Sequence, residues 1–132
     1  MPDAKKILII EDSALNRKIL EDALSQKGYQ VLLADDGRQG MDKLRDESPD
    51  LVLMDVVMPN MNGLEATRHI RAAARSQAVP IVIMTSKNTP QDMLQAFEVG
   101  ADEFLDKPIN LEELYETVDR LLNRGAEQGK IA

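Results

Sequence analysis

Short apolar runs alternate with longer mixed stretches along the whole chain. Each run is rich in Ile, Val and Leu and lacks the strict alternation of a half-exposed strand. Strands of a parallel sheet are covered on both faces, so their sequences are typically continuous apolar runs. The pattern therefore predicts buried parallel strands at 7–10, 31–33, 51–54 and 81–84, and a weaker fifth strand at 103–106.

The stretches between these runs predict helices. In the first, Leu15, Ile19, Ala23 and Leu24 fall on one helical face, and Gly28 offers a helix stop. Further helices are expected at about 38–46, 64–75 and 90–99. The last helix carries an apolar stripe with spacing i, i+3, i+4 and i+7, formed by Leu111, Leu114, Tyr115, Val118, Leu121 and Leu122.

Two local features refine the helix predictions. Asn110 and Glu113 have the spacing of an N-cap residue and its partner three positions later. Met93 and Phe97 are one helical turn apart in the fourth helix, and we expect them to face the sheet or Phe104.

Five strands that alternate with helices predict an α/β fold, in which a doubly wound parallel sheet carries helices on both faces. Right-handed crossovers then fix most of the topology. The 132 residues suffice for one domain with a proper hydrophobic core. We assign residues 1–124 to this domain and expect residues 125–132, with the sequence GAEQGKIA, to form a flexible C-terminal tail.

Composition narrows the classes of partner. The chain has 16 basic and 23 acidic residues, a net charge of −7, whereas nucleic-acid-binding surfaces are usually basic, so no nucleic-acid partner is expected. It has no cysteine, which excludes disulfides and thiolate chemistry. No apolar run approaches the roughly 18 residues needed to cross a membrane, and no secretory signal is present. We therefore expect a cytoplasmic protein with no membrane partner.

Polar residues follow four of the five predicted strands. In a doubly wound sheet, sites form beyond the carboxyl ends of the strands, so these residues should gather at one edge. They are Glu11 and Asp12 after the first strand, Asp55 at the third, Thr85 and Ser86 at the fourth, and Lys107 after the fifth.

Each of these residues alone has an ordinary explanation. A carboxylate pair after a strand is often the N-cap of the next helix, and an Asp at a strand end is often a turn residue. Thr85 alone is typical of a cap or turn, and Lys107 alone of a solvated surface. Three clustered carboxylates, however, repel one another unless a cation neutralises them. Oxygen ligands without His or Cys suit Mg²⁺.

Together these motifs resemble the receiver domain of response regulators. The resemblance covers about residues 5–124 and implies a flavodoxin-like sheet of strand order 2-1-3-4-5. The motifs that carry it are Glu11-Asp12, Asp55 within LMDVVMPNMNG at 53–63, Thr85-Ser86 and Lys107-Pro108. It also implies a cis peptide at Lys107-Pro108, a geometry that is cheap only before proline.

The resemblance implies a role for each site residue. Asp55 is implied to be the phosphoacceptor nucleophile. Mg²⁺, for which Mn²⁺ can substitute, is implied to bind Asp12, Asp55 and the backbone carbonyl of Val57, while Glu11 acts largely through a water molecule. The positive charge of the metal screens the repulsion between a carboxylate and an already anionic phosphoryl group.

Four residues are implied to respond to the phosphoryl group. Lys107 would bridge Asp55 and later the phosphoryl oxygens. Thr85 and the backbone N–H of Ser86 would donate hydrogen bonds to them. Thr85 would be drawn inward, and Phe104 would follow as the switch aromatic, without the hydroxyl that a Tyr would carry.

The implied function is that of a two-component response regulator. A sensor histidine kinase or a histidine phosphotransfer protein would phosphorylate Asp55, and the signal would pass to a downstream protein through the face of the fourth helix, fifth strand and fifth helix. The chain would be a phosphoacceptor that assists its own phosphorylation and dephosphorylation, not a conventional enzyme. The alternative is a receiver domain excised from a hybrid sensor histidine kinase.

Two other classes fit the residues poorly. Aspartyl-phosphate hydrolases resemble Asp-x-Asp after a strand, and the second position here is Val57. A flavin or nucleotide module needs a Gly-rich or hydroxyl-rich phosphate cradle after the first strand, where this chain places Glu11 and Asp12. Glu11 is a departure from the family pattern, because many receiver domains have Asp at the first position of this acidic pair.

Overall fold

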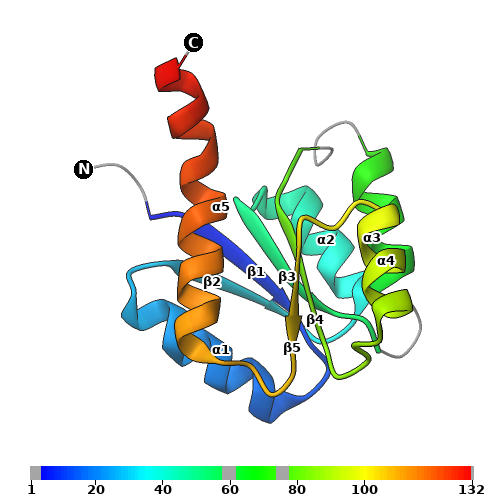
Figure 1. Ribbon diagram of the computed structural model, residues 1–132. Coiled ribbons are helices and arrows are strands. Elements are labelled where there is room, and N and C mark those ends of the chain that lie inside the picture. Colours follow the sequence, from blue (N-terminus) through cyan, green and yellow to red (C-terminus); the bar gives the residue numbers. More distant parts are fainter. Residues whose placement is uncertain (1–3, 58–61, 74–77, 132) are drawn as a thin grey trace.

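A computed structural model describes the backbone of residues 4–57, 62–73 and 78–131, and the side chains as far as residue 123. Five strands alternate with five helices in the described parts (Figure 1). The strands are β1 (Lys6–Ile10), β2 (Gln30–Ala34), β3 (Leu51–Asp55), β4 (Ile81–Thr85) and β5 (Glu103–Asp106). The helices are α1 (Ala14–Gln26), α2 (Gly37–Glu47), α3 (Gly63–Ala72), α4 (Pro90–Glu98) and α5 (Leu111–Ile131).

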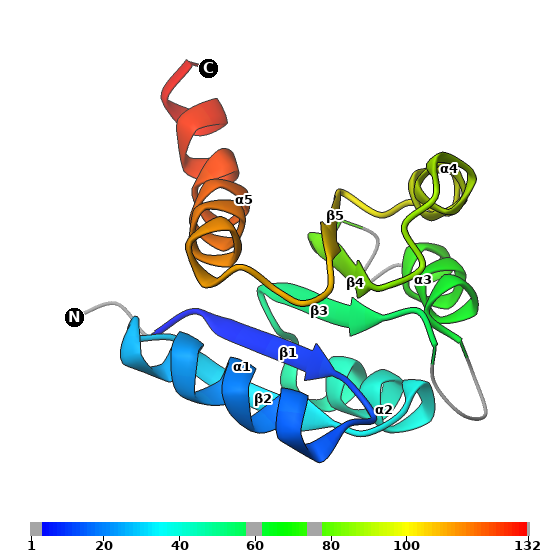
Figure 2. The ribbon, with the colours of Figure 1, turned by 60° about the horizontal axis from the view of Figure 1, so that its bottom comes forward.

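The strands form one parallel sheet in the order β2-β1-β3-β4-β5, which confirms the predicted doubly wound topology. Helices α1 and α5 cover one face, and α2, α3 and α4 cover the other, as Figures 1 and 2 show. Side chains alternate between the two faces along each strand. In β1, Ile7 and Ile9 therefore pack beneath α1 and α5, while Leu8 and Ile10 pack beneath the opposite layer.

The continuous apolar runs are buried because helices cover both faces of the sheet. All four side chains at 7–10 are fully buried, as are those at 51–54 and 81–84. Each such Ile, Leu or Val contributes about 1.5–3 kcal/mol by leaving water. The edge strand β2 is less buried, since a strand at the sheet's margin has only one neighbour.

The parallel register brings the carboxyl ends of the strands to one edge. Ile10 pairs with Met54, so the residue after β1 lies beside the last residue of β3. Asp55 pairs with Met84, and Thr85 pairs with Asp106. The predicted edge for a functional site is thus formed by the ends of β1, β3, β4 and β5.

Capping residues begin the helices beyond this edge. Ser13 accepts a hydrogen bond from the N–H of Asn16 at the start of α1. The predicted cap of α5 is confirmed, because the Asn110 side chain accepts from the Glu113 N–H at 3.0 Å. A reciprocal capping box occurs at α4, between Thr89 and Asp92, which the sequence prediction missed.

Only part of the apolar face predicted for α1 is buried. Leu20, Ala23 and Leu24 are buried, but Leu15 is 69% exposed and Ile19 is 47% exposed. The first half of α1 borders a cavity that also contacts the start of α5, and Ile19 lines that cavity instead of the sheet. In the first half of α1, Leu15 and Ile19 therefore lie beside the buried stripe of this helix and not within it.

Met93 and Phe97 were predicted to face the sheet or Phe104; neither is buried against the sheet, and a contact of either with Phe104 stays a prediction. Met93 is 38% exposed and Phe97 is 42% exposed, and Leu94 between them is 58% exposed. Within α4 it is the small Ala96 that is buried and seats the helix against the core. The larger side chains consequently remain at the surface.

Helix α5 continues to Ile131 and so runs through residues 125–131, which the sequence analysis assigned to a tail. The flexibility of that segment stays a prediction.

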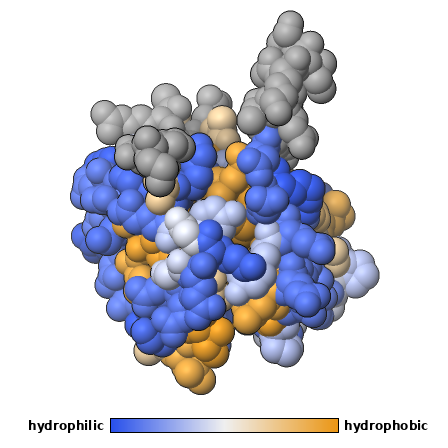
Figure 3. Space-filling model, turned by 90° about the vertical axis from the view of Figure 1, so that its left-hand side faces the viewer, coloured by the Kyte–Doolittle hydropathy of each residue, from blue (hydrophilic) through white to orange (hydrophobic). Residues whose placement is uncertain are grey.

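In the part of the chain that the structure describes, no helix is both long and apolar enough to span a membrane. Residues 74–75 of the third predicted helix and 58–61 of the Asp55 motif lie outside the described residues. The face drawn in Figure 3 is largely hydrophilic, with separate hydrophobic patches.

Candidate functional site

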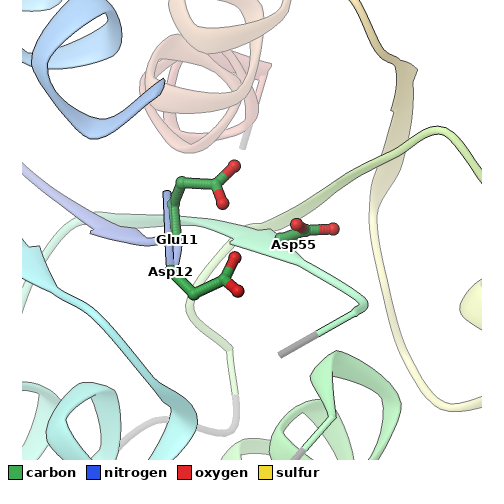
Figure 4. A group of neighbouring side chains, drawn as sticks. All are labelled: Glu11, Asp12 and Asp55. Atoms are coloured by element: carbon green, nitrogen blue, oxygen red, sulfur yellow. The ribbon is translucent and has the colours of Figure 1, made fainter. Parts of the chain in front are cut away.

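Three carboxylates converge at the carboxyl edge of the sheet. Glu11 and Asp12 follow β1, Asp55 ends β3, and Figure 4 shows the three side chains as neighbours at the ends of these strands. One carboxylate oxygen from each lies within 4.8 Å of the others. Glu11 and Asp55 are buried, whereas Asp12 is exposed to solvent. The sequence prediction that these three residues meet is therefore confirmed.

Close packing at Gly63 shapes the segment that carries Asp55. The Gly63 N–H donates to the Val56 carbonyl at 2.9 Å. A Cβ on Gly63 would lie only 2.4 Å from the Asp55 carbonyl oxygen and 2.9 Å from Val56 Cα. Only glycine allows this approach, which holds the loop after β3 against the start of α3. Asp55 also accepts a hydrogen bond from the Val57 N–H at 3.3 Å through Oδ1.

Lys107, the residue directly after β5, extends its side chain into the acidic cluster. Its Nζ forms ion pairs with Oε1 of Glu11 and, at 3.0 Å, with Oδ2 of Asp55. The Lys107 backbone N–H donates to the Thr85 carbonyl at 3.1 Å, which ties this residue to the end of β4. The Lys107–Pro108 peptide is cis, as predicted.

Electrostatics at this edge favour a cation. Although Asp12 is exposed, partial loss of its hydration raises the pKa of its carboxyl, and the hydrogen bond and negative charge of neighbouring Glu11 raise it further. Burial by itself would lower the pKa of Lys107, but the hydrogen bonds and charges of Glu11 and Asp55 outweigh it and raise that pKa. Three carboxylates and one ammonium leave two uncompensated negative charges. An all-oxygen donor set with this charge fits Mg²⁺.

The remaining predicted residues lie around this cluster. Thr85 is buried, and its hydroxyl oxygen accepts a hydrogen bond from the Lys87 N–H at 3.1 Å. Ser86 is exposed and lines the same cavity as Glu11 and Lys107. Phe104 is half-buried and packs against the core beneath α3 and α4. The structure thus brings the ends of β4 and β5 to the acidic cluster but holds the Thr85 hydroxyl within its own loop.

Two partners of Glu11 escaped the sequence analysis. The Ser13 N–H donates to Oε2 of Glu11 at 3.1 Å, and the Arg17 guanidinium donates to the Glu11 backbone carbonyl at 2.7 Å. The available signal was the hydroxyl residue directly after the carboxylate pair, which marks the start of α1.

A cavity of about 600 Å³ opens beside the cluster. Its polar wall includes Glu11, Ser86 and Lys107, and its apolar wall includes Ile19 and Leu111. The cavity therefore joins the charged site to the exposed apolar surface of α1.

Sheet order, acidic cluster and bridging lysine define a CheY-like receiver domain. The response regulator receiver domain family matches residues 7–119, and the chain belongs to this family. Receiver domains are phosphoacceptors of two-component signalling that bind Mg²⁺ at an acidic site and interact with histidine kinases and downstream targets.

The curated relatives that the chain matches differ in length. Protein PilH of Pseudomonas aeruginosa is 39% identical over 117 residues, which cover 89% of this chain and 97% of PilH. Response regulator MprA of Mycolicibacterium vanbaalenii is 37% identical over 119 residues, which cover 90% of this chain and 51% of MprA. The chain thus spans nearly all of one relative and about half of the other.

Solved structures agree with this assignment. Chemotaxis protein CheY4 of Vibrio cholerae superimposes with a TM-score of 0.86 at 32% identity, over 89% of this chain and 98% of that one. The receiver domain of sensor histidine kinase PA1611 from Pseudomonas aeruginosa, solved with magnesium in its active site cleft, gives a TM-score of 0.85 at 32% identity. That match covers 91% of this chain and 98% of the other.

Proposed function

We propose that Asp55 accepts a phosphoryl group from a phosphohistidine donor. A carboxylate oxygen of Asp55 forms the new bond to phosphorus, and the phosphorus–nitrogen bond to the imidazole breaks. Its electron pair goes to the imidazole nitrogen, which takes up a proton. The observation that carries this proposal is the 3.0 Å contact between Lys107 Nζ and Asp55 Oδ2 within the acidic cluster. An ammonium at this place offsets the charge repulsion that opposes the transfer.

The metal site is assigned to Asp12, Asp55 and the backbone carbonyl of Val57, with Glu11 contributing largely through a water molecule. The two uncompensated negative charges and the all-oxygen donors support a divalent ion, Mg²⁺ or Mn²⁺. When bound, the ion supplies positive charge beside the transferring oxygens. Asp12→Asn should raise the Kd for Mg²⁺ at least about tenfold, a scale that outer-shell changes already reach.

Lys107, the Thr85 hydroxyl and the Ser86 N–H are proposed to bind the phosphoryl oxygens. All three follow or end strands at the same edge, and Ser86 and Lys107 share a cavity. With the metal, these groups would allow the domain to assist its own phosphorylation and dephosphorylation. Each acts by holding charge and geometry, which is the main requirement of phosphoryl transfer.

The donor is a sensor histidine kinase or a histidine phosphotransfer protein. The cavity beside Lys107 and the exposed side chains of Leu15 and Ile19 support an approach along α1. Exposed apolar groups next to a reactive cluster are typical of a protein-binding surface. Leu15→Ser should therefore slow transfer from a protein donor but leave labelling by a small phosphodonor unchanged.

Output is proposed to pass through the face made by α4, β5 and α5. Inward movement of Thr85 would vacate space beside β5, and Phe104 would move into it. The exposed Met93, Leu94 and Phe97 on α4 support a protein-binding role for this face. Amide NMR with a beryllofluoride mimic and Mg²⁺ should show shifts that spread from Asp55 to α4 and Phe104. In Thr85→Ala, shifts should stay local; a distant response that persists would contradict this route.

The acidic net charge of −7 supports a protein partner over a nucleic acid. We also propose that the protein acts in the cytoplasm, without contact with a membrane. A second candidate function is that of the receiver part of a hybrid sensor kinase. The likeness to sensor-kinase receiver domains from Syntrophus aciditrophicus and Pseudomonas aeruginosa favours it. The mass of the native gene product on an immunoblot separates the two candidates.

Phosphorylation at Asp55 is tested directly. A phosphohistidine donor should label the protein only with Mg²⁺, and the label should be labile to hydroxylamine, as expected of an acyl phosphate. Asp55→Asn should remove the label, whereas Asp42→Asn on the exposed face of α2 should keep it. Stoichiometric labelling of Asp55→Asn would show that another residue is the acceptor.

A further inference from the structure

Glu11 uses both carboxylate oxygens within its own chain. Oε1 pairs with the Lys107 ammonium, and Oε2 accepts the Ser13 N–H at 3.1 Å. The Glu11 side chain is 1% exposed. A carboxylate buried this deeply needs partners for its charge, and here the ammonium is the only cationic group that the described hydrogen bonds give it. Its orientation is therefore set by Lys107, by the Ser13 N–H and by the neighbouring Asp12 side chain.

The Glu11 backbone is also fixed. Its N–H donates to the Ala34 carbonyl at 3.1 Å, and its carbonyl accepts from the Arg17 guanidinium at 2.7 Å. A forward movement of the main chain that offsets a shorter side chain would therefore break these two hydrogen bonds. An Asp at this position would end one methylene short of the Lys107 ammonium. Glutamate at position 11 thus has a geometric consequence that aspartate would lack.

Lys107 has two anchors of different kinds. Asp55 is proposed to become an acyl phosphate, and its carboxylate charge then passes to the phosphoryl group. Glu11 takes part in none of the bond changes of the proposed transfer. An ammonium held by Glu11 therefore stays at the site both before and after transfer, instead of depending on the residue that reacts.

We infer that Glu11 is a positioning residue that holds the Lys107 ammonium in place for phosphoryl transfer, and that this is its main contribution to the reaction. The inference rests on the proposed function, since it concerns the lysine of that site. A water-mediated contact with the metal remains compatible with it, because each carboxylate oxygen can accept more than one hydrogen bond.

Two variants separate the length of residue 11 from its charge. Glu11→Asp keeps the charge near the metal site but loses the reach to Lys107. Glu11→Gln keeps the reach but loses the charge. Both are compared with wild type in metal-free buffer by NMR of the ¹⁵N-labelled lysine ammonium groups. Wild type should show a slowly exchanging Lys107 signal, which Glu11→Asp should lose.

Phosphorylation kinetics then test whether Glu11 affects the rate of transfer through Lys107. Phosphoramidate, a small donor that needs no docking surface, is used at saturating Mg²⁺. Glu11→Asp should slow phosphorylation about tenfold, the effect of one charge-assisted hydrogen bond, while the Kd for Mg²⁺ changes less than about threefold. In a Lys107→Met background, Glu11→Asp should have no further effect, because contacting residues give non-additive losses.

Three outcomes overturn the inference. Glu11→Asp could raise the Kd for Mg²⁺ as much as Asp12→Asn does, which would make residue 11 a metal ligand first. It could slow phosphorylation equally with and without the lysine. It could also match wild type in both rate and ammonium signal. Failure of wild type to be labelled at Asp55 would instead count against the proposed function, so the two failures are distinguishable.

Discussion

Gly63 links the stability of the fold to the geometry of the site, so its replacement perturbs both. A Cβ there would meet the Asp55 carbonyl oxygen at 2.4 Å and Val56 Cα at 2.9 Å. Both are backbone atoms, which cannot rotate away as a side chain would. Since Cβ contacts under 3.0 Å are essentially never seen, the two segments must separate by at least 0.6 Å, the difference between 3.0 and 2.4 Å.

We expect Gly63→Ala to lower the free energy of unfolding by about 1–3 kcal/mol, the usual cost of overpacking. The opposing gain in helix propensity is at most about 1 kcal/mol, and it is reduced here because Gly63 is the first residue of α3. The same displacement moves Asp55, so the Kd for Mg²⁺ should rise as well. A purely structural defect would lower stability alone.

Urea denaturation followed by circular dichroism measures the first effect, and calorimetric titration with Mg²⁺ measures the second. Gly28→Ala is the matched control, because a Cβ there meets nothing within 4 Å. Its φ of +91° makes it costly by about 1–2 kcal/mol, but it lies just before the start of β2, at the edge of the parallel sheet opposite to the one that carries the acidic cluster. The reasoning fails if Gly63→Ala keeps wild-type stability and Mg²⁺ affinity.

Three further predictions concern single interactions. Mg²⁺ binding, followed by calorimetry, should weaken on acidification with a midpoint above pH 3.8, because partial loss of hydration and Glu11 raise the pKa of Asp12. The metal-free protein should instead lose stability as the pH rises through that pKa, because a carboxyl with a raised pKa in the folded state favours folding only while it is protonated. Thr89→Ala should remove the capping box of α4 and cost about 1 kcal/mol in urea denaturation. Arg71→Met should cost about 2–3 kcal/mol by the same measure, since its guanidinium bonds to Asp102 and to two backbone carbonyls.

Each of these has a control on the same element or group. Asp12→Asn should abolish the acid-dependent step in Mg²⁺ binding, and its persistence would assign the step to another group. Thr89→Ser, which keeps a hydroxyl, should retain most of the stability that Thr89→Ala loses. Arg68→Met replaces an exposed arginine of α3 and should change stability by less than about 0.5 kcal/mol. Equal costs for the two arginine variants would contradict the role given to Arg71.

Sequence reasoning located the strands because the physical cause of their pattern is local. Both faces of the central strands are covered, so a run such as 81–84 is apolar at every position. Helix faces are harder to predict, since a helix can bury its stripe at several rotations. Leu15 and Ile19 have core spacing, yet both side chains are exposed, and Ile19 lines a cavity beside α1.

The site was predictable for a topological reason. Parallel strands end at one edge, so the residue that follows each strand is placed there without any knowledge of side-chain contacts. The pair between Glu11 and Lys107, in contrast, joins residues 96 positions apart. Its existence depends on side-chain length and on the main-chain anchors of Glu11. No spacing rule within a single sequence contains that information.

The proposed switch at Thr85 and Phe104 needs a second arrangement of the domain, and the observed arrangement limits its free energy. The Thr85 hydroxyl accepts a hydrogen bond from the Lys87 N–H in this arrangement, and Phe104 is half-buried against the core. Moving Thr85 toward a phosphoryl group gives up that bond, a loss of about 0.5–1.5 kcal/mol. The new bond to an anionic oxygen is worth about 1.5–3 kcal/mol. Because these values differ by only a few kcal/mol at most, the bias at Thr85 is modest, and the unphosphorylated domain should populate the second arrangement measurably.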